Sequence, residues 1–396
     1  MSIIYSIAIY LYSALVWISS FFNEKAKSWV NAQKNWKKIL LNSEKTNEHI
    51  IWIHCASAGE FEQAIPIINA IKKKKANYKI YVSFFSPSGF AMYKDSKQAD
   101  YFFYFPLDTA ANAKYVVDFL QAKYVIFIRN EIWLNVLSLL YQKKTPTYLV
   151  NANLKQRRNL LYRFYLDKTF PLFTKIFSTQ DDGNTKLEQV VQNKNQIFSD
   201  KILTDFCRDS FVVILGSSWQ EEEKMMARFF IKNNAKIKII IAPHEYGDGK
   251  LEQLNSLFTS EEQSKSTIIS SYSNYQFGNT SAILFLDRKG ILKYAYRYAS
   301  IAVIGGGFNS GTHNISEAAV YGIPILFGPN YTKFEDANDF IQLETAHSFK
   351  QYEAFEQQLL IYLNDEILRN CIKEKLDVYF DKHNNVAEAI VDDIIK

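Results

Sequence analysis

A glutamate and a run of three glycines are the residues of this chain whose types and positions best suit chemistry. Glu60 stands in the run Ser57-Ala58-Gly59-Glu60, shortly after the apolar stretch from Ile50 to Cys55. A carboxylate at the end of a buried strand, where a helix begins, is well placed to act as a general base. The spacing of Ser57 and Glu60 is also that of a capping box, in which Glu60 bonds only its own helix. Both roles are open on these residues alone.

The three glycines, Gly305–Gly307, follow a short apolar run from Ile301 to Ile304. Glycine lets the backbone turn sharply and lets a ligand approach the main-chain N–H groups closely. Asn314 and Glu317 again have capping-box spacing, which predicts a helix over Ser316–Tyr321. Such a strand, loop and helix place N–H groups and the positive end of a helix dipole where a phosphate binds. An ordinary capped βαβ unit is the alternative, because GGG is weaker than a full GxGxxG fingerprint.

Apolar runs alternate with predicted helices along the chain, and polar residues directly follow many of these runs. This alternation is typical of α/β domains with buried parallel strands. The carboxyl ends of parallel strands meet at one edge of a sheet, where open α/β sheets bind their ligands. Taken singly, each polar residue is more easily explained as a cap or turn residue. The polar and small residues at the predicted edges are Ser88, Arg129 and Glu131 in the first half, and Gly216, Ser217, Pro243 and His244 in the second.

A second strand–helix alternation begins after a boundary between Ser199 and Asp209. The chain has 396 residues, of which 48% are hydrophobic, and this is enough for two separate cores. We therefore expect two domains, one over residues 23–203 and one over residues 204–396. The second is expected to include a helical C-terminal part.

The N-terminal stretch Ser2–Phe22 contains no charged residue. As a helix it would reach about 30 Å, which is the thickness of the hydrocarbon core of a bilayer. Five lysines follow between Lys25 and Lys38, so the positive-inside rule places the rest of the chain in the cytoplasm. Residues 1–22 are therefore predicted to form a single membrane-anchor helix. A buried N-terminal helix of the first domain is the alternative.

Composition argues against several other classes of function. The formal net charge is +5, and no dense stripe of Lys and Arg with interleaved aromatic residues occurs, which argues against a nucleic-acid binder. The cysteines Cys55, Cys207 and Cys371 are widely spaced and odd in number, as expected of reduced thiols rather than of disulfides or metal ligands. We expect neither a metal nor a cofactor.

Two similar α/β halves with ligand-binding edges describe the GT-B architecture of glycosyltransferases. In detail, the chain resembles the membrane-anchored 3-deoxy-D-manno-octulosonic acid (Kdo) transferases of lipopolysaccharide synthesis, and the resemblance covers nearly its whole length. The first motif, His54–Glu60, looks like the H-x-x-S-x-G-E of that family. The other matching stretches are Ser86–Gly89, Phe105–Asp108, Glu131–Trp133, Gly216–Ser218, Pro243–His244, Gly305–Phe308, His313–Glu317 and Phe327–Asn330.

The resemblance implies an inverting glycosyltransferase with a GT-B fold, that is, two Rossmann-like domains with a cleft between them, plus the N-terminal membrane-anchor helix. It implies CMP-Kdo as the donor substrate and the lipid A precursor (lipid IVA) as the acceptor. It also implies work at the cytoplasmic face of the inner membrane, in contact with the lipids of that membrane.

The resemblance also assigns roles to particular residues. Glu60 matches the base that takes the proton of the acceptor hydroxyl, and Glu317 matches a glutamate that binds the ribose hydroxyls of the nucleotide. The residues implied in donor-substrate binding are Gly216, Ser217, Pro243, His244, Gly305, Gly306, Gly307, Asn314 and Glu317. Those implied on the acceptor side are Ser57, Gly59, Ser88, Arg129 and Glu131.

Three other functions fit parts of the pattern. Another GT-B transferase would share both halves, and so would a UDP-sugar epimerase. An epimerase acts on a soluble substrate and needs no anchor, so the charge-free stretch Ser2–Phe22 argues against it. A membrane-docked protein that binds a nucleotide sugar without turning it over would keep the glycine loop but would not need Glu60 as a base.

Overall fold

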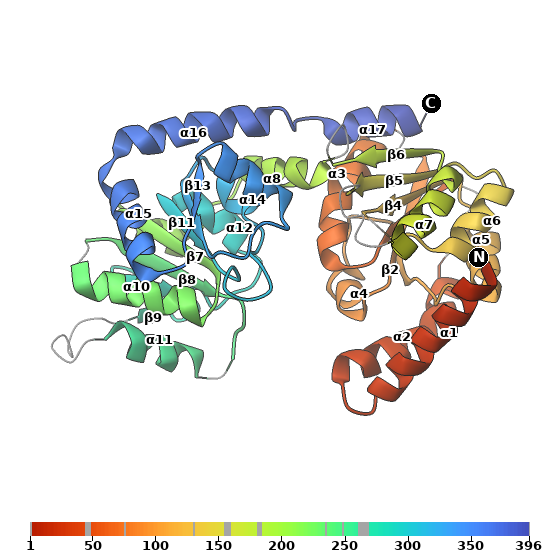
Figure 1. Cartoon of the computed structure of the whole chain (residues 1–396), viewed down its shortest axis with the longest axis horizontal. Helices are drawn as coiled ribbons and strands as arrows, with labels where there is room; N and C mark the ends of the chain where they lie inside the picture. Colours follow the sequence, from red (N-terminus) through yellow and green to blue (C-terminus); the bar gives the residue numbers. More distant parts are fainter. Residues whose placement is uncertain are drawn as a thin grey trace. The chain divides into compact units, whose positions relative to one another are not determined.

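Figure 1 shows a computed structural model of the chain. The structure describes residues 2–43, 49–74, 77–129, 131–153, 160–179, 184–233, 236–247, 249–259 and 269–395. The chain forms two compact units, each built on one parallel sheet. The first unit comprises Met1–Gln189 and His383–Lys396, and the second comprises Val190–Lys382.

The sheet of the first unit has six parallel strands in the order β3-β2-β1-β4-β5-β6. The chain runs outward from β1 through β2 to β3 and then returns to the other side of β1 with β4, which makes the gap between β1 and β4 the topological switch point. Ligands of open α/β sheets bind at the carboxyl ends of the strands that flank such a point. The strands are β1 (His49–Cys55), β2 (Tyr78–Phe84), β3 (Tyr101–Tyr104), β4 (Tyr124–Ile128), β5 (Thr147–Ala152) and β6 (Lys175–Ser178).

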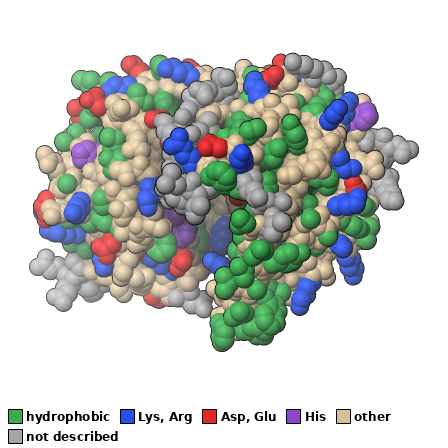
Figure 2. All heavy atoms as spheres, turned by 45° about the vertical axis from the view of Figure 1, so that its right-hand side comes forward, with side chains coloured by type: hydrophobic (Ala, Val, Ile, Leu, Met, Phe, Trp, Pro, Cys, Tyr) green, Lys and Arg blue, Asp and Glu red, His purple; other side chains and the backbone are tan. Residues whose placement is uncertain are grey.

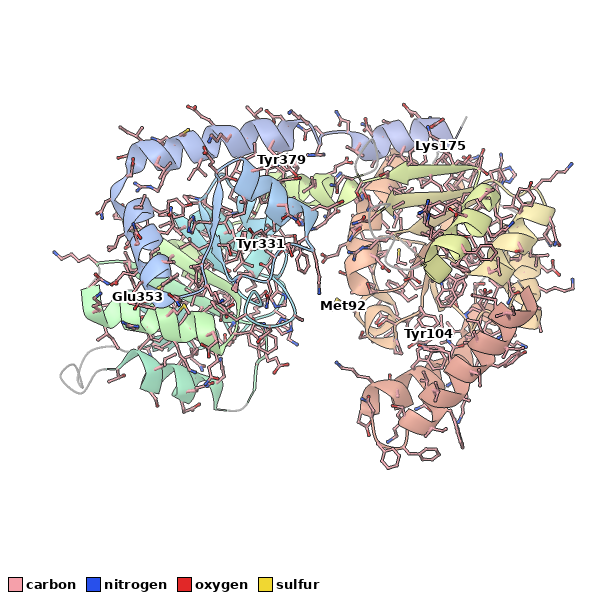
Figure 3. All side chains as sticks on the ribbon, in the orientation of Figure 1. Met92, Tyr104, Lys175, Tyr331, Glu353 and Tyr379 are labelled. Atoms are coloured by element: carbon pink, nitrogen blue, oxygen red, sulfur yellow. The ribbon has the colours of Figure 1, made fainter. Side chains whose placement is uncertain are left out.

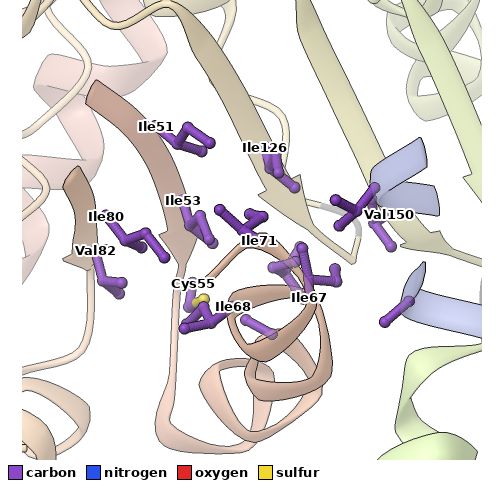
Figure 4. Packing of buried hydrophobic residues seen from close by; sticks show 14 of the residues in the cluster. Ile51, Ile53, Cys55, Ile67, Ile68, Ile71, Ile80, Val82, Ile126 and Val150 are labelled. Atoms are coloured by element: carbon purple, nitrogen blue, oxygen red, sulfur yellow. The ribbon is translucent and has the colours of Figure 1, made fainter. Parts of the chain in front are cut away.

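Helices cover both faces of this sheet, because each central strand buries side chains on both sides. Ile51, Ile53 and Cys55 of β1 point to the face covered by α3 (Ala58–Lys74), as Figure 4 shows. Trp52, between them, belongs to the core on the opposite face. The helices that complete the two layers are α4 (Pro87–Tyr93), α5 (Ala110–Leu120), α6 (Leu134–Gln142) and α7 (Leu160–Thr169).

The last helix, α17 (Val386–Ile394), belongs to the first unit although the expected division ended that domain at residue 203. Its residues Ala387, Ile390, Val391 and Ile394 are buried in the same core as α3. Ion pairs hold its polar side, among them Lys73 with Glu388 at 2.6 Å and Lys74 with Asp392 at 2.7 Å. Lys175, labelled in Figure 3, pairs with Asp393 of the same helix. The structure thus corrects the domain division at both the boundary and the C-terminus.

The sheet of the second unit has seven parallel strands in the order β13-β12-β11-β7-β8-β10-β9. Its switch point lies between β7 and β11, since the chain first runs from β7 toward β9 and later returns beside β7. The strands are β7 (Val212–Ser218), β8 (Lys238–Pro243), β9 (Ile269–Ser271), β10 (Ile283–Phe285), β11 (Ile301–Ile304), β12 (Ile325–Phe327) and β13 (Ala346–Ser348). The helices are α8 (Thr185–Asn195), which begins in the first unit, α9 (Lys201–Cys207), α10 (Gln220–Asn233), α11 (Lys250–Phe258), α12 (Leu292–Ala295), α13 (Ser316–Ala319), α14 (Glu335–Gln342), α15 (Tyr352–Asn364) and α16 (Glu366–Asp381).

Two helices precede the first strand, α1 (Ser2–Ser19) and α2 (Glu24–Leu41), and they pack against each other. Figure 2 shows hydrophobic side chains gathered over α1 and the turn after it, in the lower part of that view. Ten large apolar side chains there are exposed, namely Ile4, Ile7, Tyr10, Leu11, Tyr12, Leu15, Trp17, Ile18, Phe21 and Phe22. Across the described part of the chain, no helix has both the length and the apolarity that a membrane span requires.

Candidate active site

Glu60 lies in the first turn of α3, directly beyond the carboxyl end of β1 at the switch point of the first unit. Its side chain is only 8% exposed, and Oε2 accepts a hydrogen bond from the N–H of Ser57 at 3.0 Å. The capping contact predicted from the spacing of Ser57 and Glu60 is therefore present. Burial raises the pKa of Glu60 to about 7, helped by the negative charge of Glu131. The N–H of Ser57 and the charge of Arg129 act in the opposite direction. A carboxyl group with such a pKa is suited to exchanging protons near neutral pH.

The raised pKa of Glu60 predicts how transfer depends on pH. Because a general base must be ionised, kcat/KM should rise as the pH increases through about 7 and then level off. Glu131→Gln removes the second cause of the shift, so the rise in kcat/KM should move to lower pH.

The stability of the fold depends on pH in the opposite sense. Because the pKa of Glu60 in the folded protein lies above the ordinary 4.5, its contribution to the free energy of unfolding is fully present below pH 4.5 and is lost as the pH rises through 7. Rate profiles of both proteins measure the first effect, and a profile that is flat through this range would contradict the assignment.

Arg129 and Glu131 follow β4, the other strand that flanks the switch point. Arg129 is exposed and has φ +67°, a left-handed backbone that is uncommon for a residue other than glycine. Both residues influence the pKa of Glu60, with opposite signs. The structure thus brings Glu60 close to Arg129 and Glu131, which follow a different strand and lie far from Glu60 in the sequence, as the edge pattern predicted.

The remaining acceptor-side residues lie around the turn that carries Glu60. The N–H of Ser86 donates to the carbonyl of Ala56 at 2.8 Å, so the loop after β2 is held against this turn. Ser88 lies in the first turn of α4, which follows that loop, and its hydroxyl bonds the hydroxyl of Ser86 at 2.8 Å. Gly59 faces open space, because a Cβ there would meet no atom within 4 Å. Room is therefore available beside the carboxylate.

His54, in β1 shortly before the Glu60 turn, is a buried histidine whose partners could not be predicted from the sequence. The indole N–H of Trp133 donates to Nε2 of His54 at 3.0 Å, and Nδ1 of His54 lies 2.9 Å from the hydroxyl oxygen of Ser83. Because an indole can only donate, Nε2 carries no proton and the imidazole is the neutral Nδ1–H form. Burial also lowers the pKa of His54. Glu131 lies 3.9 Å from the same nitrogen, but Nε2 has no proton to offer it. His54 is a core histidine, and its bond with Trp133 also attaches the Glu131–Trp133 loop to β1.

In the second unit, the loop after β11 lies against the end of β7 at the switch point. Gly305 donates its N–H to the carbonyl of Gly216 at 2.9 Å, and a Cβ on Gly305 would come within 2.1 Å of the carbonyl oxygen of Ser217. Gly306 has φ +89°, which suits glycine. Gly216 serves packing, because a Cβ there would collide with the buried Tyr296 hydroxyl. The glycines allow two backbone segments to approach each other at the edge where a nucleotide is expected.

The helix after this loop differs from its prediction. α13 covers only Ser316–Ala319, and its N-cap residue is Ile315 rather than Asn314. Nδ2 of Asn314 instead donates to Oε1 of Glu317 at 2.9 Å, so the two side chains bond each other and the expected capping box is wrong. A helix of one turn has little macrodipole. An anion at this edge would therefore depend on the N–H groups of the loop more than on a helix dipole.

Three aromatic rings stack at this edge, and the sequence analysis did not predict the stack. The ring centroids of Trp219 and His244 lie 4.8 Å apart, and those of His244 and His313 lie 4.4 Å apart. The indole N–H of Trp219 donates to Nε2 of His313 at 3.1 Å, which again leaves the proton on Nδ1. Burial and the nearby His244 lower the pKa of His313 to about 4. His244 follows Pro243, the last residue of β8, so both lie where they were predicted. Trp219 directly follows the Gly216–Ser218 motif, and this position in the sequence could have marked it as a residue of the site.

Several buried polar atoms of this edge have no partner among the described residues. They are Oε1 of Glu222, Oγ1 of Thr312 and Oδ1 of Asn314. Burial raises the pKa of Glu222 to about 7, and the N–H of Gly306 opposes that shift, so this carboxyl lies beside the glycine loop. Buried polar groups are normally hydrogen-bonded. These atoms are candidates to contact a polar ligand. Across the described ranges, no three His, Cys, Asp or Glu side chains converge as metal ligands.

Comparisons with known proteins show what the sequence and the fold are similar to. The sequence profile of the 3-deoxy-D-manno-octulosonic-acid transferase (Kdo transferase) family matches residues 33–200. A 3-deoxy-D-manno-octulosonic acid transferase of Aquifex aeolicus is 28% identical over 316 residues, which cover 77% of this chain and 83% of that protein. The chain is thus similar to Kdo transferases, both through the family match over residues 33–200 and through several curated relatives. The matched segment contains the Glu60 turn and the Glu131–Trp133 loop.

Solved structures share the fold of this chain at low sequence identity. A UDP-N-acetylglucosamine 2-epimerase of Listeria monocytogenes, described as putative, covers 87% of this chain and 95% of its own, with TM-score 0.60 and 12% identity. MurG of Acinetobacter baumannii covers 88% and 99%, with TM-score 0.52 and 13% identity. These neighbours support an α/β fold of the GT-B type with parallel sheets, and they concern the fold alone.

Proposed function

We propose that this protein transfers Kdo from CMP-Kdo to the lipid A precursor (lipid IVA), with inversion, in lipopolysaccharide synthesis. The observation that carries the proposal is Glu60: a buried carboxyl group with its pKa raised to about 7, at the switch point of the first sheet, in a chain similar to Kdo transferases. Arg129 and Glu131 beside it supply the charges that adjust this pKa.

The chemistry needs one base and one stabilised leaving group. A sugar hydroxyl of the acceptor attacks the anomeric carbon of Kdo, and the bond from that carbon to the phosphate oxygen of CMP breaks. The hydroxyl proton passes to the carboxylate of Glu60, and CMP leaves with the electron pair of the broken bond. A positioned base contributes typically ~10²–10⁴-fold to such a step. In the resting state the same carboxylate accepts the N–H of Ser57, which keeps it oriented.

The second unit is proposed to bind CMP and the charge that grows on its phosphate. Support comes from the Gly305–Gly307 loop, which packs against the end of β7 at the switch point, and from His313, whose Nδ1–H is a neutral hydrogen-bond donor. Glu317 would accept hydrogen bonds from the ribose hydroxyls.

We further propose that the N-terminal segment holds the enzyme at the cytoplasmic face of the inner membrane, where its lipid-borne acceptor lies. The exposed apolar side chains of α1 and the lysines that follow in α2 support this. Confining both molecules to one surface would raise their effective concentration. The full membrane span expected for residues 1–22 stays a prediction.

A vesicle experiment tests the membrane proposal. The double variant Trp17→Ser, Phe22→Ser removes two exposed apolar side chains and should weaken binding to anionic phospholipid vesicles by tenfold or more, on the order of the burial energy of such groups. Ile367→Ser, at a side chain that is 83% exposed on α16, is the matched control and should change nothing. Equal flotation of the wild type and the double variant would remove α1 from this role.

A donor-substrate panel tests the proposed function. Purified protein is incubated with the tetraacyl lipid A precursor and either CMP-Kdo or UDP-N-acetylglucosamine, and the products are weighed by mass spectrometry. We expect a Kdo adduct of the precursor with CMP-Kdo only. Turnover of the UDP-sugar without turnover of CMP-Kdo would overturn the assignment. Binding of CMP-Kdo without any product would favour a binding protein.

A further inference from the structure

The hydroxyl of Tyr5, on the largely exposed apolar helix α1, is bonded inside the first unit. The hydroxyl of Tyr5 donates to Oδ2 of Asp108 at 2.8 Å, and Asp108, which follows β3, is fully buried. Burying a carboxylate is costly unless it is well bonded. The contact is therefore unlike the loose apolar contacts expected of a helix that serves only as an anchor.

Asp108 also fixes the start of α6. The N–H of Asn135 donates to Oδ2 of Asp108 at 2.9 Å, and that of Val136 donates to Oδ1 at 3.1 Å. The first N–H groups of a helix have no partner within the helix, and a side chain at the N-cap usually accepts their hydrogen bonds. The N-cap residue here is Trp133, and it makes no side-chain cap bond among the described residues. Asp108 therefore caps α6 from a distant part of the chain.

A second set of contacts leads from Tyr5 to residues 131–133, the loop that directly precedes α6. The ring of Tyr5 stacks on that of Tyr165, with centroids 6.1 Å apart and planes 12° apart. The hydroxyl of Tyr165 in turn donates to the carbonyl of Ile132 at 2.7 Å. Tyr12 lies two turns further along the same face of α1. Burial raises the pKa of Tyr12, and the negative charge of Glu131 adds to that shift. The first route from α1 thus ends at the start of α6, directly after residues 131–133, and the second ends at Ile132 within them.

Residues 131–133 act on the proposed base, Glu60, and on the strand that precedes it. Trp133 donates to His54 at 3.0 Å, and Glu131 helps to raise the pKa of Glu60. Trp133 also packs against the cluster formed by Ile9 of α1 and Trp29 of α2. A displacement of α1 would therefore be felt at the loop on the acceptor side through hydrogen bonds and through packing.

We propose that α1 is a positioning element of the transfer reaction, and that Tyr5 is its positioning residue. When α1 is packed in place, Tyr5 contacts Asp108 and Tyr165, and these two residues bond the start of α6 and Ile132. The segment so held keeps Trp133 and Glu131 in place near Glu60. An enzyme whose α1 lies on the membrane would in this way have its acceptor-side loop ordered where its acceptor is found. This inference rests on the proposed transferase function.

The test uses the full chain with Tyr5→Phe, which keeps the ring stacked on Tyr165 and removes only the hydroxyl. Tyr10→Phe is the matched control, since Tyr10 lies on the same helix and is 59% exposed. Proteins labelled with 5-fluorotryptophan are compared by 19F NMR, with the Trp133 signal assigned from Trp133→Phe. We expect the Trp133 signal to shift in Tyr5→Phe and to stay in place in Tyr10→Phe. With CMP-Kdo and acceptor, kcat should fall roughly tenfold in Tyr5→Phe, the order of a lost hydrogen bond to a charged group.

The remaining readouts separate the outcomes. CMP affinity and vesicle binding should match the wild type in Tyr5→Phe, because neither the second unit nor the apolar surface of α1 changes. Asp108→Asn is the second variant, and it should move the same Trp133 signal if Tyr5→Phe folds poorly. An unmoved Trp133 signal in both variants would overturn the positioning role, whatever reaction the enzyme performs. A wild type that transfers no Kdo, but whose Trp133 signal depends on Tyr5, would overturn the proposed function and leave the coupling in place.

Discussion

Replacing Glu60 with glutamine should lower the rate of Kdo transfer by roughly 10²–10⁴-fold and leave the affinity for CMP unchanged. The amide oxygen of glutamine can still accept the N–H of Ser57, which Glu60 accepts at 3.0 Å, so the start of α3 should keep its geometry. The amide cannot take a proton from the acceptor hydroxyl. Single-turnover transfer measures the first quantity, and calorimetric titration with CMP measures the second.

Glu62→Gln is the matched control, because Glu62 lies on the same helix and accepts a hydrogen bond from the Tyr93 hydroxyl at 3.1 Å. It should transfer Kdo at close to the wild-type rate. Transfer by Glu60→Gln at close to that rate would show that another group removes the proton. Loss of CMP binding in the same variant would point to a change of fold rather than of chemistry.

Replacing Glu317 with alanine should weaken CMP binding by roughly tenfold to a hundredfold, the range of a lost hydrogen bond to a charged group. In the structure Oε1 of Glu317 accepts from Asn314 at 2.9 Å, which orients the carboxylate. The turn itself has an independent attachment, because the hydroxyl of Ser316 donates to Asp336 at 2.7 Å. Binding should therefore fall more than stability does. Calorimetry with CMP and thermal unfolding measure the two quantities.

A surface carboxylate of the same unit supplies the control for Glu317→Ala. Glu344 is exposed and pairs with Lys375 at 3.0 Å, and its replacement by alanine should alter neither quantity appreciably. If Glu317→Ala bound CMP as tightly as the wild type and melted at a lower temperature, Glu317 would be a structural residue only.

Local sequence patterns were enough to locate the strand edges and the residues beyond them. The apolar runs before Glu60, Glu131 and Gly305 are buried parallel strands, and each is followed by the turn that the small and polar residues indicated. Strand and turn preferences act between near neighbours, so a short window of sequence contains them. The contact of Glu60 with Ser57 is of the same local kind.

Local patterns failed where near neighbours compete for the same bond. Asn314 and Glu317 have the spacing of a capping box, yet their side chains bond each other and α13 begins at Ser316. The spacing of the two residues permits either arrangement, and only the folded structure shows which of them forms. A pattern of residue types cannot express that choice.

Contacts between distant segments decided the rest of the site. The pairing of Trp133 with His54, the capping of α6 by Asp108 and the return of α17 to the first unit each join residues that are remote in the chain. Each depends on how the strands are ordered in the sheet and on which helix face is left uncovered, and the free energy of these contacts exists only after both partners are in place. The amino-acid pattern therefore determined which chemical groups stand at the strand ends, whereas the folded unit determined their protonation and their partners.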